Sequence, residues 1–66
     1  MSKKEYFYNK QLQKYFNKHF RQYEQTVEWF NNPDVNSWKF YIPDICKIII
    51  LICQDNGEVI EKNLVM

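Results

Sequence analysis

The feature that most constrains the fold is an unbroken apolar run, KIIILIC, at positions 47–53. Successive side chains of a β-strand point to opposite faces of its sheet, so a strand with one face in water alternates apolar and polar residues. This run is apolar on both faces, and it is far shorter than the ~20 apolar residues of a membrane-spanning helix. We therefore expect a buried strand with one face under the protein's own helix and the other under a second cover.

The first half of the sequence predicts one amphipathic helix from residue 3 to about residue 31. Aromatic and aliphatic residues recur at intervals of three and four along one face, and mainly basic and amide residues lie opposite. Ser2 precedes Glu5 by three residues, which is the spacing of a capping box. The run NNPD at 31–34 should end the helix, because proline lacks the amide donor of the next turn.

Three strands are expected after the helix, over residues 38–42, 45–54 and 59–65. Asn56 and Gly57 predict a type I′ turn with a two-residue loop between the last two strands. The whole chain, residues 1–66, is then one small α+β domain in which the helix lies across a three-stranded antiparallel meander. A domain of this size buries only ~60% of the surface of its unfolded chain, so its stability alone is marginal.

The hairpin register decides which apolar residues share a face. A two-residue loop places the following residues on one face: Ile49, Leu51, Cys53, Ile60, Lys62 and Leu64. A three-residue loop shifts this pairing by one residue. The apolar members of that set, Ile49, Leu51, Cys53, Ile60 and Leu64, are our predicted interface with a second copy, in a homodimer, or with another protein. Alternatively, loop residues such as Val35 fold over the back of the sheet.

Charge is distributed unevenly along a chain whose formal net charge is +1. Residues 1–21 carry six basic side chains and one acidic, whereas the rest of the chain carries three and seven. A stripe on the helix is expected to be either a solvated face or a contact for phosphates or an acidic surface. Its members are Lys10, Lys14, Lys18 and Arg21. Since Arg21 is the only arginine, the helix has little capacity for bidentate reading of bases.

Two aromatic residues of the predicted helix, Phe7 and Trp29, lie outside its main apolar arc. Exposed aromatic side chains are typical of binding hot spots. We expect Trp29 to pack against Trp38 instead, whereas Phe7 remains a candidate for partner contact or for burial near the chain end.

No motif in the sequence indicates catalysis, a cofactor or a metal. His19 is the only histidine, and we expect it at the boundary of the aromatic core. A metal site from Cys46, Cys53, His19 and Asp44 matches no common ligand spacing. The two cysteines are seven residues apart on one predicted strand and should point to opposite faces, so we expect free thiols in a reducing cytoplasm.

The sequence favours a non-enzymatic protein-binding module. The abundance of Lys, Asn, Ile, Phe and Tyr resembles that of small accessory proteins of phages and mobile elements, which implies an inhibitor that occludes a surface of a host or defence protein. The alternative is a nucleic-acid-binding protein that uses the basic helix stripe.

Overall fold

Helix α1 spans Lys3–His19 and begins where the sequence predicts. The Ser2 hydroxyl accepts a hydrogen bond from the Glu5 amide at 3.1 Å, which satisfies one free donor of the first turn. The structure is a computed structural model that describes residues 2–31 and 34–65, apart from the side chain of Val65. The prediction of helix to residue 31 is wrong beyond His19. The predicted stop at Asn32 and Pro33 lies outside the described residues.

The chain leaves the helix at Phe20, whose backbone angles (φ −129°, ψ 8°) are not helical. A 3₁₀ turn, η1 (Arg21–Tyr23), follows and leads to the short strand β1 (Glu28–Trp29). Phe20 is buried, and Val27 packs against the core from the segment between this turn and β1. The residues that mimic a helical period are therefore covered without a helix. The β-branched and aromatic residues at 26–30 favour a strand there.

Four strands form one antiparallel sheet in the order β1-β2-β3-β4, so each strand pairs with its neighbour in the sequence. The remaining bounds are β2, Ser37–Ile42; β3, Lys47–Cys53; and β4, Val59–Val65. The predicted α+β class is confirmed, with four strands rather than three because β1 comes from the segment predicted as helix. The bounds of β4 are those predicted.

A second 3₁₀ turn, η2 (Pro43–Ile45), joins β2 to β3 and ends at Cys46. Cys46 adopts a left-handed conformation (φ 53°, ψ 48°), so the strand predicted to start at residue 45 starts at residue 47. The placement of both cysteines on one strand is therefore wrong. Cys46 is exposed in the turn, Cys53 is buried in β3, and both thiols are free.

The loop between β3 and β4 has three residues, 55–57, rather than two. The Gln54 amide donates to the Glu58 carbonyl at 2.8 Å, and the Gly57 amide donates to the Gln54 carbonyl at 2.9 Å. Gly57 has φ 91°, which completes a turn closed by a left-handed glycine, the G1 bulge. The predicted type I′ turn is wrong, because an Asn-Gly pair also suits this longer loop, whose glycine again needs a positive φ.

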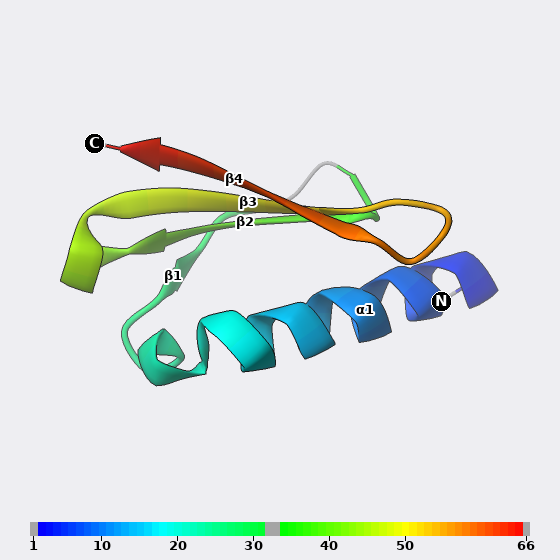
Figure 1. Ribbon diagram of the computed structural model, residues 1–66, viewed down its shortest axis with the longest axis horizontal. Helices are drawn as coiled ribbons and strands as arrows, with labels where there is room; N and C mark the ends of the chain where they lie inside the picture. Colours follow the sequence, from blue (N-terminus) through cyan, green and yellow to red (C-terminus); the bar gives the residue numbers. More distant parts are fainter. Residues whose placement is uncertain (1, 32–33, 66) are drawn as a thin grey trace.

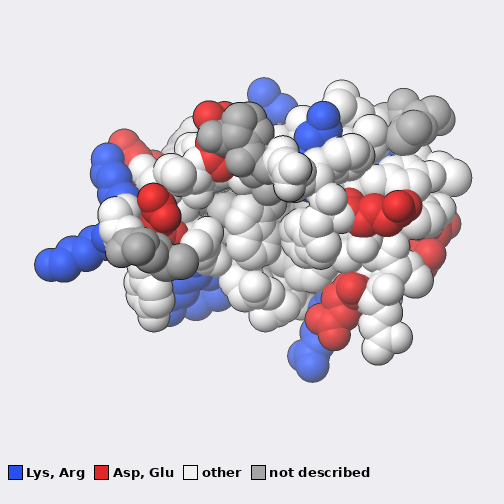
Figure 2. Space-filling view, turned by 180° about the vertical axis from the view of Figure 1, so that it is seen from behind, with Lys and Arg blue, Asp and Glu red and all other residues white. Residues whose placement is uncertain are grey.

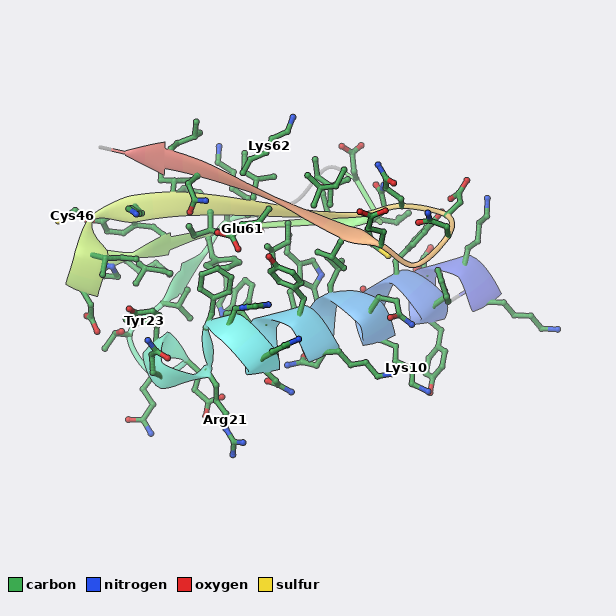
Figure 3. The ribbon with its side chains drawn as sticks, viewed as in Figure 1. Lys10, Arg21, Tyr23, Cys46, Glu61 and Lys62 are labelled. Atoms are coloured by element: carbon green, nitrogen blue, oxygen red, sulfur yellow. The ribbon has the colours of Figure 1, made fainter. Side chains whose placement is uncertain are left out.

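The longer loop moves the β3–β4 register by one residue. Cys53 pairs with Val59, Ile52 with Ile60 and Leu51 with Glu61. In Figure 3, Glu61 points toward α1 while Lys62 points to the opposite side of the sheet. The register predicted from a two-residue loop is wrong, and the one-residue shift expected for a three-residue loop is confirmed.

Helix α1 lies along one face of the sheet, and the core fills the space between these two layers (Figure 1). The buried residues are Tyr8, Leu12, Phe16, Phe20, Phe40, Ile42, Ile49, Leu51 and Cys53. Aromatic rings meet edge to face within this layer, including Phe16 on Phe40 at 5.4 Å between centroids. The predicted contact of Trp29 with Trp38 is confirmed, at 5.4 Å between centroids.

Candidate functional site

The five residues predicted to form an interface are divided between the two faces of the sheet. Ile49, Leu51 and Cys53 are fully buried in the core layer under α1. Ile60 and Leu64 are 37% and 50% exposed on the opposite face. The first three are thus part of the core and face no external partner in this fold, and the one-residue shift in register separates them from Ile60 and Leu64.

The opposite face carries an apolar surface that joins Ile60 and Leu64, from the predicted interface, with β3 residues that were not assigned to it. The alternate residues of β3 point there, and the register brings β4 side chains beside them. We call this surface the outer apolar face; it consists of Ile48, Ile50, Ile52, Ile60 and Leu64. Its three β3 residues are half-buried, although they lie on the middle of the sheet. Because the run at 47–53 is apolar on both faces, the sequence did not show which face lies under α1, and the loop length decides only which β4 residues share each face.

Two lysines flank the centre of the outer apolar face. Ile50 pairs with Lys39 on β2 and with Lys62 on β4, so the three side chains form a row across the sheet. The Lys39 ammonium also lies over the Phe30 ring, at 5.1 Å from its centroid. Val35, which was expected to fold over this face in the alternative prediction, is 55% exposed.

The predicted basic stripe is present on the surface of α1 and just beyond it. All four side chains, Lys10, Lys14, Lys18 and Arg21, are exposed. Lys10 and Arg21 point away from the sheet (Figure 3). Lys14 and Lys18 line a shallow groove beside β4, together with Gln11, Tyr15, Gly57 and Val59. The stripe therefore has an outward part and a part that borders the edge of the sheet.

Phe7 has a structural role. It is half-buried against the core, and a Cβ atom added to Gly57 would lie 3.3 Å from the Phe7 ring. The most exposed large aromatic residue of the helix is Tyr6, at 61%. The helical wheel could not identify the burial of Phe7, because the hairpin loop that covers it is distant in the sequence.

An exposed aromatic cluster lies at the β1–β2 side of the molecule. Trp29, Phe30, Trp38 and Gln13 line a shallow groove, and Trp29 remains 51% exposed. In the view turned by 180° from Figure 1, charged side chains lie mainly around the rim and uncharged atoms occupy the centre (Figure 2). This cluster depends on β1, which the sequence prediction had missed.

Two tyrosines of α1 hold carboxylates of the β3–β4 hairpin. The Tyr8 hydroxyl donates to Asp55 Oδ1 at 2.6 Å, and the Tyr15 hydroxyl donates to Glu61 Oε1 at 2.8 Å. Burial and the Glu61 hydrogen bond raise the pKa of Tyr15 to about 12. The Asp55 hydrogen bond, followed by burial, raises the pKa of Tyr8 above its ordinary value. These contacts fasten the helix to the hairpin.

The residues considered for a metal site are dispersed. His19 is exposed at the end of α1, with its ring 4.4 Å from that of Tyr15 between centroids. Burial is the main cause of a raised pKa for the Cys53 thiol. Over residues 2–31 and 34–65, no group of three or more His, Cys, Asp or Glu side chains is arranged to hold a metal ion.

Across the described part of the chain, no helix is both long and apolar enough to cross a membrane. Comparisons with protein-family models, curated proteins and solved structures found no match. The functional proposal therefore depends on the surfaces of this structure.

Proposed function

We propose that this chain is a small, non-enzymatic protein-binding module that occupies a surface of a partner through its outer apolar face. The observation that supports the proposal is the contiguous apolar surface on the side of the sheet opposite α1. Its outer members, Ile60 and Leu64, remain 37% and 50% exposed. Covering such a surface removes apolar area from water and favours association.

The charges beside the centre of this face indicate the chemistry of the partner, whereas Glu28, which pairs with Tyr41, lies farther out on β1. Lys39 and Lys62 flank Ile50, so a partner with apolar side chains bordered by Asp or Glu fits best. A second copy would bring the lysines of two subunits to one interface. Self-association through this face, the homodimer expected from the sequence, is therefore opposed by like charges and should strengthen with salt.

The abundance of Lys, Asn, Ile, Phe and Tyr suggests a biological role for such a module. In that form, the chain is a cytoplasmic phage or mobile-element protein that inhibits or regulates a host or defence protein by covering its surface. Asp or Glu side chains at the border of the partner's surface would complement Lys39 and Lys62. Such complementary charge sets the rate and orientation of docking more than the affinity.

Affinity capture from nuclease-treated cell extract tests the protein-binding proposal when the wild type is compared with Ile50→Lys. This substitution places a third cation at the centre of the outer apolar face. Val35→Lys is the matched control, because Val35 is an exposed apolar residue of the connection between β1 and β2. We expect one stoichiometric protein to be captured by the wild type and by Val35→Lys but not by Ile50→Lys. Equal capture by all three, with unchanged thermal unfolding, would reject this face as the contact.

Nucleic-acid binding by the basic stripe is a second candidate function. It is supported by the exposure of all four cations and by the absence of Asp and Glu from residues 6–23 of the sequence. Such contacts would be to the phosphate backbone and weakly selective for sequence.

Fluorescence anisotropy with a labelled mixed-sequence DNA duplex distinguishes the two functions. Under the second candidate, binding weakens steeply with salt and is lost in the double variant Lys14→Glu, Lys18→Glu, while Ile50→Lys binds normally. Under the protein-binding proposal, the double variant still captures the protein partner through the outer apolar face.

A further inference from the structure

We infer that the open edge of β4 pairs with an extended, acidic segment of the partner, which adds a fifth strand to the sheet. The inference rests on the proposed protein-binding function and names the form in which the partner is bound. It uses β4 and the groove beside it, whereas the proposed contact is centred on Ile50.

The two edges of the sheet differ in the length of backbone that they offer. The strand order places β1 at one edge and β4 at the other. β1 has two residues, Glu28–Trp29, whereas β4 has seven, Val59–Val65. A long edge strand is a template for strand addition, a common mode of peptide recognition.

The hydrogen-bond pattern shows which backbone groups of β4 face the open edge. The Gln54 amide donates to the Glu58 carbonyl, so the backbone of Glu58 faces β3. The Cys53 amide, one residue earlier, donates to the Asn36 carbonyl on the other side of β3. Because the two patterns alternate along an antiparallel pair, the amides and carbonyls of Val59, Glu61 and Asn63 point away from β3. These groups are placed to bond an added strand.

Basic side chains border this edge on both sides of the sheet, and the exposed acidic residue Glu58 lies at its loop end. On the helix side, Lys14 and Lys18 line the groove that reaches Val59. On the other side, Lys62 lies between the exposed residues Ile60 and Leu64 along β4. The Glu61 carboxylate accepts bonds from Tyr15 at 2.8 Å and from Asn63 at 2.8 Å, so these partners already occupy it. Charge complementarity therefore favours acidic side chains in the added strand.

The same lysines argue against a second copy of the chain at this edge. Full-length antiparallel pairing of two β4 strands, Val59–Val65, would place Lys62 directly opposite Lys62 of the other copy. Like charges in opposed positions destabilise strand pairing, and lysine on an edge strand is a common protection against self-association. An acidic strand turns this repulsion into attraction.

The alternation of β4 side chains also specifies a pattern for the partner segment. Side chains opposite Ile60 and Leu64 should be apolar, and the one opposite Lys62 should be acidic. A fluorescein-labelled peptide, DVTETVD, has this pattern with further acidic residues at its ends. The peptide KVTKTVK is its charge-reversed control.

Fluorescence anisotropy of the two peptides against the full chain is the first test. We expect DVTETVD to bind and KVTKTVK to bind at least about tenfold more weakly. The variant Lys62→Glu should weaken binding of DVTETVD about tenfold and improve binding of KVTKTVK, whereas Lys39→Glu, on β2, should do neither. Equal binding of the two peptides by the wild type would overturn the inference.

A backbone variant tests strand addition itself. Asn63→Pro removes an amide that points to the open edge, so it should leave the β3–β4 ladder intact and abolish peptide binding. Asn63→Ala is the matched control, because it loses the same side chain and keeps the amide. If Asn63→Pro is folded and binds DVTETVD as Asn63→Ala does, strand addition is wrong. A wild-type dimer in sedimentation that Asn63→Pro dissociates would assign the edge to a second copy and also overturn the inference.

The partner captured by the wild type separates this inference from the proposed function. Loss of capture by Ile50→Lys, with capture retained by Asn63→Pro, would support the outer apolar face and reject the edge. Loss of capture by Asn63→Pro alone would support the edge and reject the outer apolar face as the contact.

Discussion

The two faces of β3 have similar composition and different surroundings. Toward α1, Ile49 and Leu51 are fully buried among aromatic rings of the helix and of β2. On the other side, Ile50 and Ile52 are only half-buried, with Ile60 and Leu64 exposed next to them. One strand therefore contributes a core on one side and a candidate contact surface on the other. The same residue type stabilises the fold or favours association according to the face on which it lies.

The largest expected effect is the loss of stability when a side chain on the buried face of β3 is shortened, compared with the same change on the outer face. Leu51→Ala should lower the free energy of unfolding by about 2–5 kcal/mol, because the fully buried site leaves a cavity. Ile50→Ala should lower it by about 1 kcal/mol, since its side chain is already in contact with water. Urea denaturation measures both. Equal losses would show that the outer apolar face is as well packed as the core.

The hairpin loop fixes which β4 residues lie on each face of the sheet, and its glycine is the next residue to test. Gly57→Ala should cost about 1–2 kcal/mol, because φ 91° disfavours a side chain and the added Cβ would lie 3.3 Å from the Phe7 ring. Gly57→Asn separates the two causes, since asparagine tolerates positive φ better than alanine does. A similar cost for both variants would assign the effect to Phe7, and thermal unfolding measures it.

The hydrogen bond from Tyr15 to Glu61 joins α1 to the face of β4 that the helix covers. Its contribution to the stability of the fold should fall at alkaline pH. The pKa of Tyr15 is raised from 10.0 to about 12, mainly by burial, so the folded protein holds this proton more tightly than the unfolded chain. The stabilisation is complete below pH 10 and is lost as the pH rises from 10 to 12. Tyr15→Phe should cost about 1 kcal/mol at pH 7 and reduce the loss of stability between pH 10 and pH 12.

The control for that measurement is Tyr6→Phe, at an exposed tyrosine of the same helix. It should leave the stability at pH 7 unchanged, because the Tyr6 side chain is 61% exposed. A decline in Tyr15→Phe as steep as in the wild type would show that other groups control the alkaline transition.

The smallest expected effect is at the start of the helix that covers the inner face. Ser2→Ala removes the acceptor of the Glu5 amide and should cost about 0.5–1 kcal/mol. Ser2→Asp, which retains a capping oxygen, should restore the stability. Circular dichroism during thermal unfolding measures both variants, and an unchanged Ser2→Ala would mean that the first turn is frayed.

Local signals in the sequence predicted much of this fold. The alternation in Trp38, Lys39 and Phe40 and the turn residues at 56–57 located strands and hairpin correctly. The end of α1 was missed because Phe20, Tyr23 and Val27 keep a helical spacing while they pack against the core from a turn. Local spacing cannot distinguish these two ways of covering the same residues.

The candidate surface was harder to predict than the fold. In the run at 47–53 neither face is marked by polar residues, so the sequence did not show which face lies under α1. The β4 residues on each face depended on whether the hairpin loop had two residues or three. Asn56-Gly57 suits both lengths. The Tyr15–Glu61 contact needs Glu61 on the helix side of β4, as in the observed register, but it joins residues too distant in the sequence for pattern analysis.

The consecutive pairing of the strands also has a consequence for how the chain folds. Each strand meets its sequence neighbour, so the sheet can form from hairpins that close short loops. The Tyr8–Asp55 and Tyr15–Glu61 contacts instead join residues 47 and 46 positions apart and close most of the chain into a loop. The helix should therefore dock late, and weakening these contacts should accelerate unfolding more than it slows folding.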